Sequence, residues 1–134
     1  MINIENEIIT AVTKDIHDYD SKIKVASEYI PSPSEFPHIS IVEQDNSTYD
    51  STLTSGNGEN HVSVMYEVDV YSNLTRGKKT ECKKLMAIID NTMINMGFSR
   101  IMLQPIPNMD NNTIYRMKAR YRGVVSKDKT IYRR

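Results

Sequence analysis

Polar and apolar residues alternate along two stretches of the chain, and this pattern predicts two long strands that each bury one face. From 62 to 70, every second residue is a valine or a tyrosine, and Glu67 and Asp69 lie among the residues between them. In the segment 113–125, tyrosine, methionine and alanine side chains alternate with a row of cations, the basic row: Arg116, Lys118, Arg120 and Arg122.

Two other segments carry apolar residues at the spacing of a helix. The first has Ile4, Ile8, Ala11, Val12 and Ile16. We expect it to begin at an N-cap, Asn3, and to end near His17 or Asp18. The second segment, 78–96, has an inner stripe that consists of Cys82, Leu85, Met86, Ile89, Met93 and Met96. Gly97 follows it as a C′ residue.

Shorter strands and turns fill the rest of the chain. The patterns predict strands at 22–30, with Ile23, Val25 and Tyr29 on one side, and at 38–44, 100–104 and 130–132. The sequence PSPSEFP between the first two is a stiff connector, and Pro105 is expected to end the third. The polar stretch 44–61 predicts a long loop, which is either a hairpin tip or a segment that orders against a partner.

These elements together predict an α+β fold with a mainly antiparallel sheet and two helices packed on one face. Runs of strands joined by turns favour this arrangement over a parallel sheet. A chain of 134 residues corresponds to one domain, 1–134, with a long polar loop at 45–60.

The two long strands are expected to share the core beneath the helix at 78–96, so that their polar faces point the same way. If they are neighbours, Glu67 and Asp69 lie opposite the basic row at the distance that favours cross-strand pairs. The tyrosines then belong to the core, on the face opposite the cations. Base stacking together with phosphate contact needs both groups on one accessible face. We therefore favour a row that faces solvent or another subunit over a nucleic-acid groove.

The overall charge balance supports this preference. The chain has 17 basic and 17 acidic residues, and a general nucleic-acid binder usually carries a basic excess. The N-terminal residues lack the features of a signal peptide, and no apolar segment approaches the length that crosses a bilayer. We expect an intracellular, soluble protein.

The residues capable of chemistry form no recognisable site. Cys82 lies on the apolar helical stripe, where a small core residue is the better interpretation than a nucleophile. His17, His38 and His61 stand on separate segments without metal-ligand spacing. We expect no catalytic, metal-binding or cofactor-binding residue, and therefore no enzyme.

Three strings in the chain resemble a known family. They are VMYEVDVYSN, the segment GKKTECKKLMAIIDNTMINMGF that follows it, and YRMKARYRGVV after a turn rich in proline and asparagine. Together with PHISIVEQ, they are similar to the tail terminator, or tail-completion, proteins of long-tailed bacteriophages and phage-tail-like particles. The resemblance covers about residues 4–125, and other neck and minor capsid proteins share similar strings.

The resemblance implies an α+β sandwich with a structural role. Members of the family form a ring, typically a hexamer, at the head-proximal end of the tail tube. The ring ends polymerisation of the tube and provides the joint to the head. The implied partners are other copies of the chain, the tail tube protein and the head–tail connector protein, with passage of DNA through the lumen and no membrane. The implied location is a virion or tail-like particle assembled in the host cytoplasm.

The resemblance does not say which residues make these contacts, and we select candidates on physical grounds. A closed ring needs two different patches of one chain to meet. The candidate interface residues come from the long loop, the two long strands and the start of the second helix: Asp45, Tyr49, Asp50, Leu53, Glu67, Asp69, Arg76, Lys78, Lys79, Arg116, Lys118, Arg120 and Arg122. The alternatives are a small nucleic-acid-binding module that uses the strand 116–122 and another neck or minor capsid protein.

Overall fold

The structure is a computed structural model of the whole chain. It describes residues 2–30, 33, 35–48, 61–106, 113–126, 129 and 131–132. The elements in chain order are α1 (Glu5–Tyr19), β1 (Lys24–Ala26), β2 (His38–Thr48), β3 (His61–Ser72), α2 (Lys78–Met96), β4 (Ser99–Ile106), β5 (Tyr115–Ser126) and β6 (Ile131–Tyr132).

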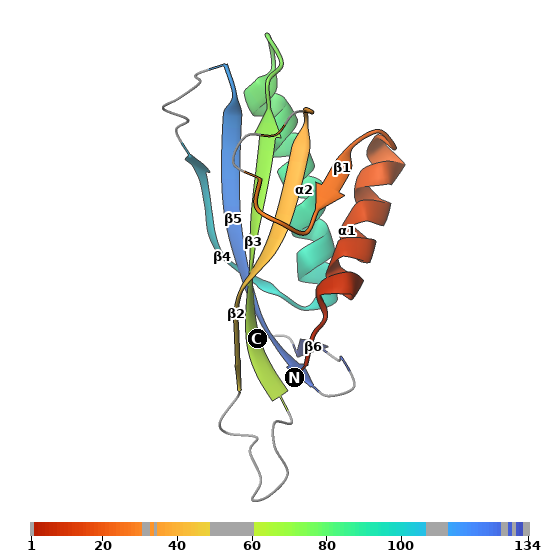
Figure 1. Cartoon of the computed structure of the whole chain (residues 1–134), viewed down its shortest axis with the longest axis vertical. Helices are drawn as coiled ribbons and strands as arrows, with labels where there is room; N and C mark the ends of the chain where they lie inside the picture. The colour runs from red at the N-terminus through yellow and green to blue at the C-terminus, as the bar shows by residue number, and fades with distance from the viewer. Residues whose placement is uncertain are drawn as a thin grey trace, which may run out of the picture.

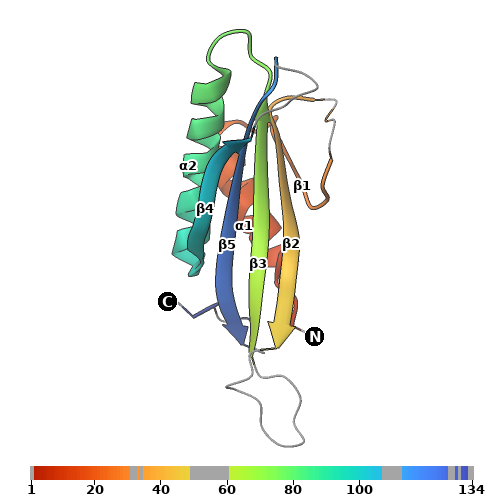
Figure 2. The same ribbon diagram turned by 90° about the vertical axis from the view of Figure 1, so that its left-hand side faces the viewer.

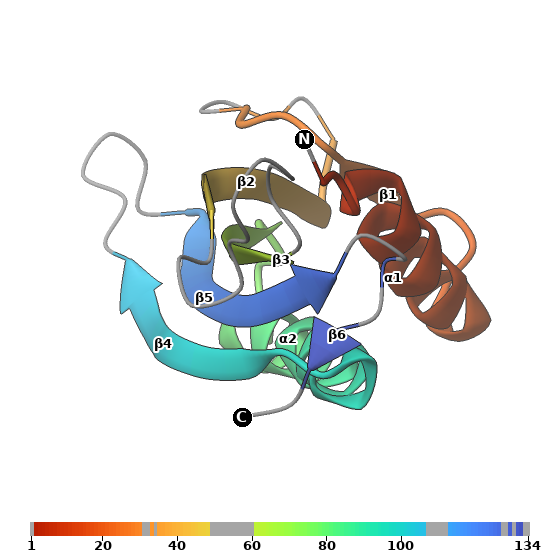
Figure 3. The ribbon, with the colours of Figure 1, turned by 90° about the horizontal axis from the view of Figure 1, so that it is seen from below.

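The strands form one sheet in the order β1-β2-β3-β5-β4, and β6 adds to β5 beyond the start of β4. Every neighbouring pair is antiparallel except β1 with β2. Both helices lie on the same side of this sheet (Figures 1 and 2), which confirms the predicted α+β fold. Seen along the strands, the sheet curves, with β4 and β1 at its two edges (Figure 3).

Helix α2 forms where its apolar stripe predicts it. Five members of the stripe are buried and Met96 is half-buried, so the stripe faces the sheet. The helix ends at Gly97, which has a φ of 110° and donates its amide to the carbonyl of Ile94. A left-handed φ of this kind is why glycine suits the position.

Helix α1 begins at Glu5, one residue later than the start that Asn3 as N-cap predicts. The side chain of Asn3 accepts a hydrogen bond of 2.9 Å from the amide of Glu5, so it still satisfies one amide of the first turn. The helix ends at Tyr19, and its buried residues are Ile8, Val12 and Ile16.

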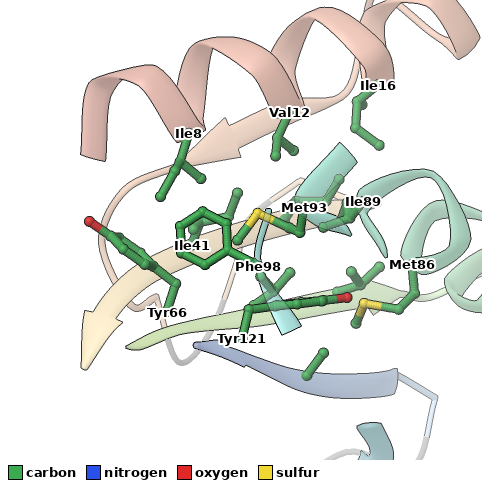
Figure 4. Packing of buried hydrophobic residues seen from close by; sticks show 14 of the residues in the cluster. Ile8, Val12, Ile16, Ile41, Tyr66, Met86, Ile89, Met93, Phe98 and Tyr121 are labelled. Atoms are coloured by element: carbon green, nitrogen blue, oxygen red, sulfur yellow. The ribbon is translucent and has the colours of Figure 1, made fainter. Parts of the chain in front are cut away.

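The core lies between the two helices and the sheet (Figure 4). The inward-facing residues of β3, predicted from the alternation, are all buried. Tyr66 and Tyr121 are fully buried and are direct partners on β3 and β5. Their hydroxyl groups donate to Glu43 at 3.2 Å and to Asp90 at 2.8 Å. Each large ring is therefore buried without leaving its polar group unpaired.

Two of the predicted strands have other bounds in the structure. The strand expected at 22–30 is only β1, Lys24–Ala26, and Tyr29 lies outside it and is exposed. The strand expected at 38–44 continues as β2 to Thr48, past a register shift between Glu43 and Asp45. Pairing with β3 supplies backbone hydrogen bonds to this polar end, which local hydrophobicity does not reveal.

Strand β4 also extends beyond its predicted end. Pro105 was expected to terminate it, but the strand includes Pro105 and ends at Ile106. The reason is its place at the edge of the sheet, where a missing amide hydrogen can point away from the neighbouring strand.

Candidate functional site

The face of the sheet that carries no helix holds most of the described candidate residues. Glu67, Asp69 and Tyr71 of β3 are the direct partners of Arg120, Lys118 and Arg116 of β5. The two long strands are therefore neighbours, and opposite charges face each other as expected for that arrangement. Figure 2 views this open face, in front of both helices.

Three of the four cations of the basic row form ion pairs with β3. The Nε and Nη2 atoms of Arg116 each lie 2.9 Å from Oδ1 of Asp69, on the diagonal between the strands. Lys118 pairs with Oε1 of Glu67, and Nε of Arg120 lies 3.2 Å from Oε2 of the same carboxylate. The long cationic side chains lie across the two acids, and both acids are buried as a result.

The two acids respond differently to this environment. Burial raises the pKa of Asp69, and the opposing effect of Arg116 is too small to cancel it. Burial also acts to raise the pKa of Glu67, but Lys118 and Arg120 together outweigh it and hold that pKa below its ordinary value. Two factors explain the difference: Asp69 is the more deeply buried of the two acids, and it has one ion-pair partner whereas Glu67 has two.

Aromatic rings also lie on the open face, and their contacts with Arg116 were not predicted from the sequence. The guanidinium carbon of Arg116 is 5.2 Å from the ring centroid of Tyr71 and 5.6 Å from that of Tyr29. Both distances fall within the range of cation–π attraction. The alternation along β3 places Tyr71 on the same face as Glu67 and Asp69, whereas the position of Tyr29 depends on the connector that follows β1.

Arg122 differs from the other three cations of the row. Its direct partner on β3 is Met65, and on β4 it is Ser99. No acidic side chain in the described ranges pairs with its guanidinium. Among the described residues it is the cation of the row without an acidic partner, so its charge can serve a contact with another molecule.

The second group of candidate cations lies elsewhere. Arg76 is exposed in the turn before α2, and Lys78 and Lys79 are the first residues of that helix. The helix covers the opposite face of the sheet, so the fold does not bring this group together with the basic row.

The four candidates from the predicted loop divide in two. Asp45 belongs to β2, so its assignment to a loop was wrong, and it is exposed there opposite Met65. Residues 46–48 of the predicted loop also belong to β2, whereas Tyr49, Asp50 and Leu53 lie outside the described residues with the rest of 49–60.

The open face includes two buried polar groups that the sequence did not single out. Nε2 of His38 and Oγ of Ser40 have no hydrogen-bond partner within the described part of the chain. Burial lowers the pKa of His38, which keeps the ring neutral. The two groups do not bond to each other, so His38 does not activate Ser40 in the way a general base activates a nucleophile.

Residues with metal-binding or nucleophilic side chains show no assembled site. Cys82 is buried, as predicted for a core residue, and burial raises the pKa of its thiol to about 12. Over the described ranges, no group of three histidine, cysteine, aspartate or glutamate side chains could hold a metal ion.

Two comparisons with known proteins found no match. No protein-family model matches the chain, and no curated protein matches it either. Neither helix in the described part of the chain is long and apolar enough to cross a membrane.

Proposed function

We propose that this chain is a ring-forming structural protein of a phage tail or tail-like particle, which ends the tail tube and joins it to the head connector. The observation that carries the proposal is the placement of the three strings that resemble tail terminators. They form β3, α2 and β5. β3 and β5 are neighbours along twelve residue pairs, and α2 packs against both. The resemblance thus falls on one contiguous structural unit.

The distribution of charge supports self-assembly. A ring of identical subunits brings two different patches together at every contact. The chain is neutral overall, and beside its ion pairs it keeps exposed charges of both signs on different elements: Arg76 and Lys79 lie near the start of α2, and Asp45 lies on β2. Patches of opposite sign on one neutral subunit suit contacts between copies.

The ion pairs on the open face weigh against a general nucleic-acid groove. Arg116, Lys118 and Arg120 already neutralise acids of the same sheet, so each has less charge left for a phosphate. A narrower role, in which Arg122 faces DNA that passes through a ring lumen, is compatible with this geometry.

One observation favours nucleic-acid binding as the second candidate. Tyr29 is exposed and lies on the same face as Arg116, so stacking and phosphate contact could occur together there. Binding of this kind weakens steeply as the salt concentration rises. If neither DNA nor RNA shows a salt-sensitive shift with the purified protein, this second function is excluded.

Tube assembly tests the first proposal. The purified protein is mixed with the tube protein of the same particle, and tube lengths are measured by negative-stain electron microscopy. We expect tubes to stop growing, each with a ring at one end. Tubes that elongate without limit would overturn the proposal.

A charge reversal and its control add detail to this experiment. Arg122→Glu changes the sign of the unpaired cation of the basic row, whereas Lys14→Glu makes the same change on the exposed surface of α1. If the open face takes part in assembly, the first variant ends tubes less efficiently and the second behaves as the unaltered protein does.

A further inference from the structure

Apart from the short strands β1 and β6, two strand edges in the described part of the sheet have no neighbouring strand. One is the outer edge of β4. The other is the outer edge of β2 from residue 41 onward, because β1 pairs with β2 only at residues 38–40. Figure 2 shows them on opposite sides of the sheet. An unpaired edge offers a row of amide and carbonyl groups to another chain.

The β4 edge lacks most of the features that prevent such pairing. Its eight residues include one charged side chain, Arg100. Ile101 and Leu103 are 46% and 38% exposed, which is high for large apolar side chains on a strand. Proteins usually protect edges with charges, prolines or short strands. Here Pro105 protects only the end of the strand.

Apolar surface continues beside this edge. A groove of about 280 Å³ runs between α2 and β4, and its walls include Met86 and Ala87 of the helix, Leu103 of β4 and Met117 of β5. A chain segment that paired with β4 would also cover part of this groove.

The direction of the strands determines how two copies could pair edge to edge. β2 and β5 are both antiparallel to β3, and β4 is antiparallel to β5, so β2 and β4 run in opposite directions. A copy placed sideways in the plane of the sheet therefore sets its β2 antiparallel to β4. Antiparallel pairing is slightly more stable per residue than parallel pairing.

The register across the sheet shows which residues would meet. Arg100 is at the level of Glu43, through the partners Tyr121 and Tyr66 that lie between them. Leu103 is at the level of Ile41 in the same way, and these two levels have their side chains on the helix side of the sheet.

The remaining residues of the two edges fit the same register. Met102 is at the level of Val42 on the open face, and the bulge residue Ile101 lies between Arg100 and Met102. After Leu103, the corresponding residues of β2 are those that already pair with β1. Pro105, which lacks an amide hydrogen, lies at that end.

The matched charges have bonding capacity left within each subunit. Nη1 of Arg100 lies 3.3 Å from Asp90, and the other guanidinium nitrogens carry further donors. Oε1 of Glu43 accepts from Tyr66 and Asn46, while Oε2 takes part in no hydrogen bond or ion pair recorded among the described residues. An arginine of one copy could therefore pair with the glutamate of the next.

We propose that the segment 99–103 of β4 pairs with the segment 41–45 of β2 in a second copy, which makes the sheet continuous across the subunit contact. Arg100 faces Glu43 of the neighbouring copy, and Leu103 and Met102 face Ile41 and Val42. The contact joins two different edges, so it repeats around a closed ring. The inference rests on the proposed ring and names the surface that builds it.

Cysteine cross-linking tests the register directly. Residues that face each other in an antiparallel pair lie within disulfide range. Under oxidation, the double variant Met102→Cys/Val42→Cys is expected to give a ladder of covalent oligomers on a denaturing gel. Each single variant is expected to stay monomeric, because Cys82 is buried. Dimers from Met102→Cys alone would mean that two β4 edges pair with each other, and that result overturns the proposal.

Charge reversal tests the pairing by a second route. Arg100→Glu and Glu43→Arg should each weaken self-association at least about tenfold, because each sets like charges opposite one another. A mixture of the two variants should associate again, since every contact between them restores one acid and one base. Failure of the mixture to recover, while both variants melt as cooperatively as the unaltered chain, contradicts the pairing.

An apolar position supplies a matched control. Leu103→Lys should reduce self-association in sedimentation velocity, whereas Ile94→Lys, at a similarly exposed isoleucine on α2, should leave it unchanged. A protein that stays monomeric at concentrations up to about 1 mM has no such edge contact, and the proposal is then wrong.

The outcomes for the ring surface and for the function are separable. If the protein ends tail tubes but the cysteine pair gives no ladder, the function stands and the edge contact is overturned. If the ladder forms but tubes grow without limit, the edge contact stands and the tail function is overturned.

Discussion

The strand β3 is buried on both faces of the sheet from Tyr66 to Ser72, but by different means. On the helix side, valines and tyrosines of β3 pack against the apolar stripes of α1 and α2. On the other side no helix is present, and Glu67, Asp69 and Tyr71 of the same strand are buried all the same. Their cover consists largely of the side chains of β5, the neighbouring strand.

The difference shows that burial and stabilisation are separate quantities. Each apolar side chain buried on the helix side contributes about 1.5–3 kcal/mol relative to an exposed one. On the open face, ion pairing must first offset the cost of removing the charges from water, so the net gain is small. The helix side therefore supplies most of the stability, and the open face fixes which strands and residues meet.

Truncation in the core should produce the largest loss. Ile89→Ala removes a fully buried side chain that faces the sheet, and we expect the free energy of unfolding to fall by about 2–5 kcal/mol. Urea denaturation measures this change. Ile94→Ala on the exposed side of the same helix is the control and should change stability by no more than about 0.5 kcal/mol.

Loss of one acid from the open face should have the next largest effect. Asp69→Ala leaves Arg116 without its ion-pair partner in a half-buried position, and we expect a loss of about 1–3 kcal/mol in urea denaturation. The double variant Asp69→Leu/Arg116→Met removes both charges and should recover most of that loss. If the double variant is less stable than the single one, the net stabilisation by the Asp69–Arg116 pair is not small.

The pKa shifts of the two acids predict opposite pH dependence. Folding lowers the pKa of Glu67. Its contribution to the free energy of unfolding is therefore present above the unfolded-state pKa and is lost as the pH falls through the folded-state pKa. The pKa of Asp69 is raised, so its contribution is present at low pH and is lost as the pH rises through the folded-state value.

Two isosteric variants measure this contrast through urea midpoints at several values between about pH 3 and pH 6, where carboxyl groups titrate. The stability deficit of Glu67→Gln should grow as the pH rises, and that of Asp69→Asn should shrink. Parallel pH profiles for the two variants would contradict the opposite pKa shifts of Glu67 and Asp69.

The smallest effect is expected at Arg122. Arg122→Ala removes a cation without an ion-pair partner among the described residues, so thermal and urea unfolding should change by less than about 0.5 kcal/mol. A larger loss, comparable with that of Arg116→Ala, would mean that the row acts as one network within the subunit rather than as three paired cations and one available cation.

Parts of the candidate site followed from local pattern alone. The alternation of β3 and β5 placed Glu67 and Asp69 on the same face as the basic row, because side chains of a strand point to opposite sides in turn. The helical spacing likewise placed Cys82 in the core. The places of Tyr29, His38 and Ser40 on the open face were not predicted, since they depend on the connector after β1 and on the pairing of β2 with β3.

The sequence by itself determined the class of each main element and the face that each one buries, because these depend on spacings of two and of 3.6 residues. Only the tertiary structure decided which strands are neighbours, where β2 and β4 end, and which cation of the basic row lacks an acidic partner among the described residues. Those outcomes depend on hydrogen bonds and ion pairs between residues such as Asp69 and Arg116, which are 47 positions apart and which no local pattern connects.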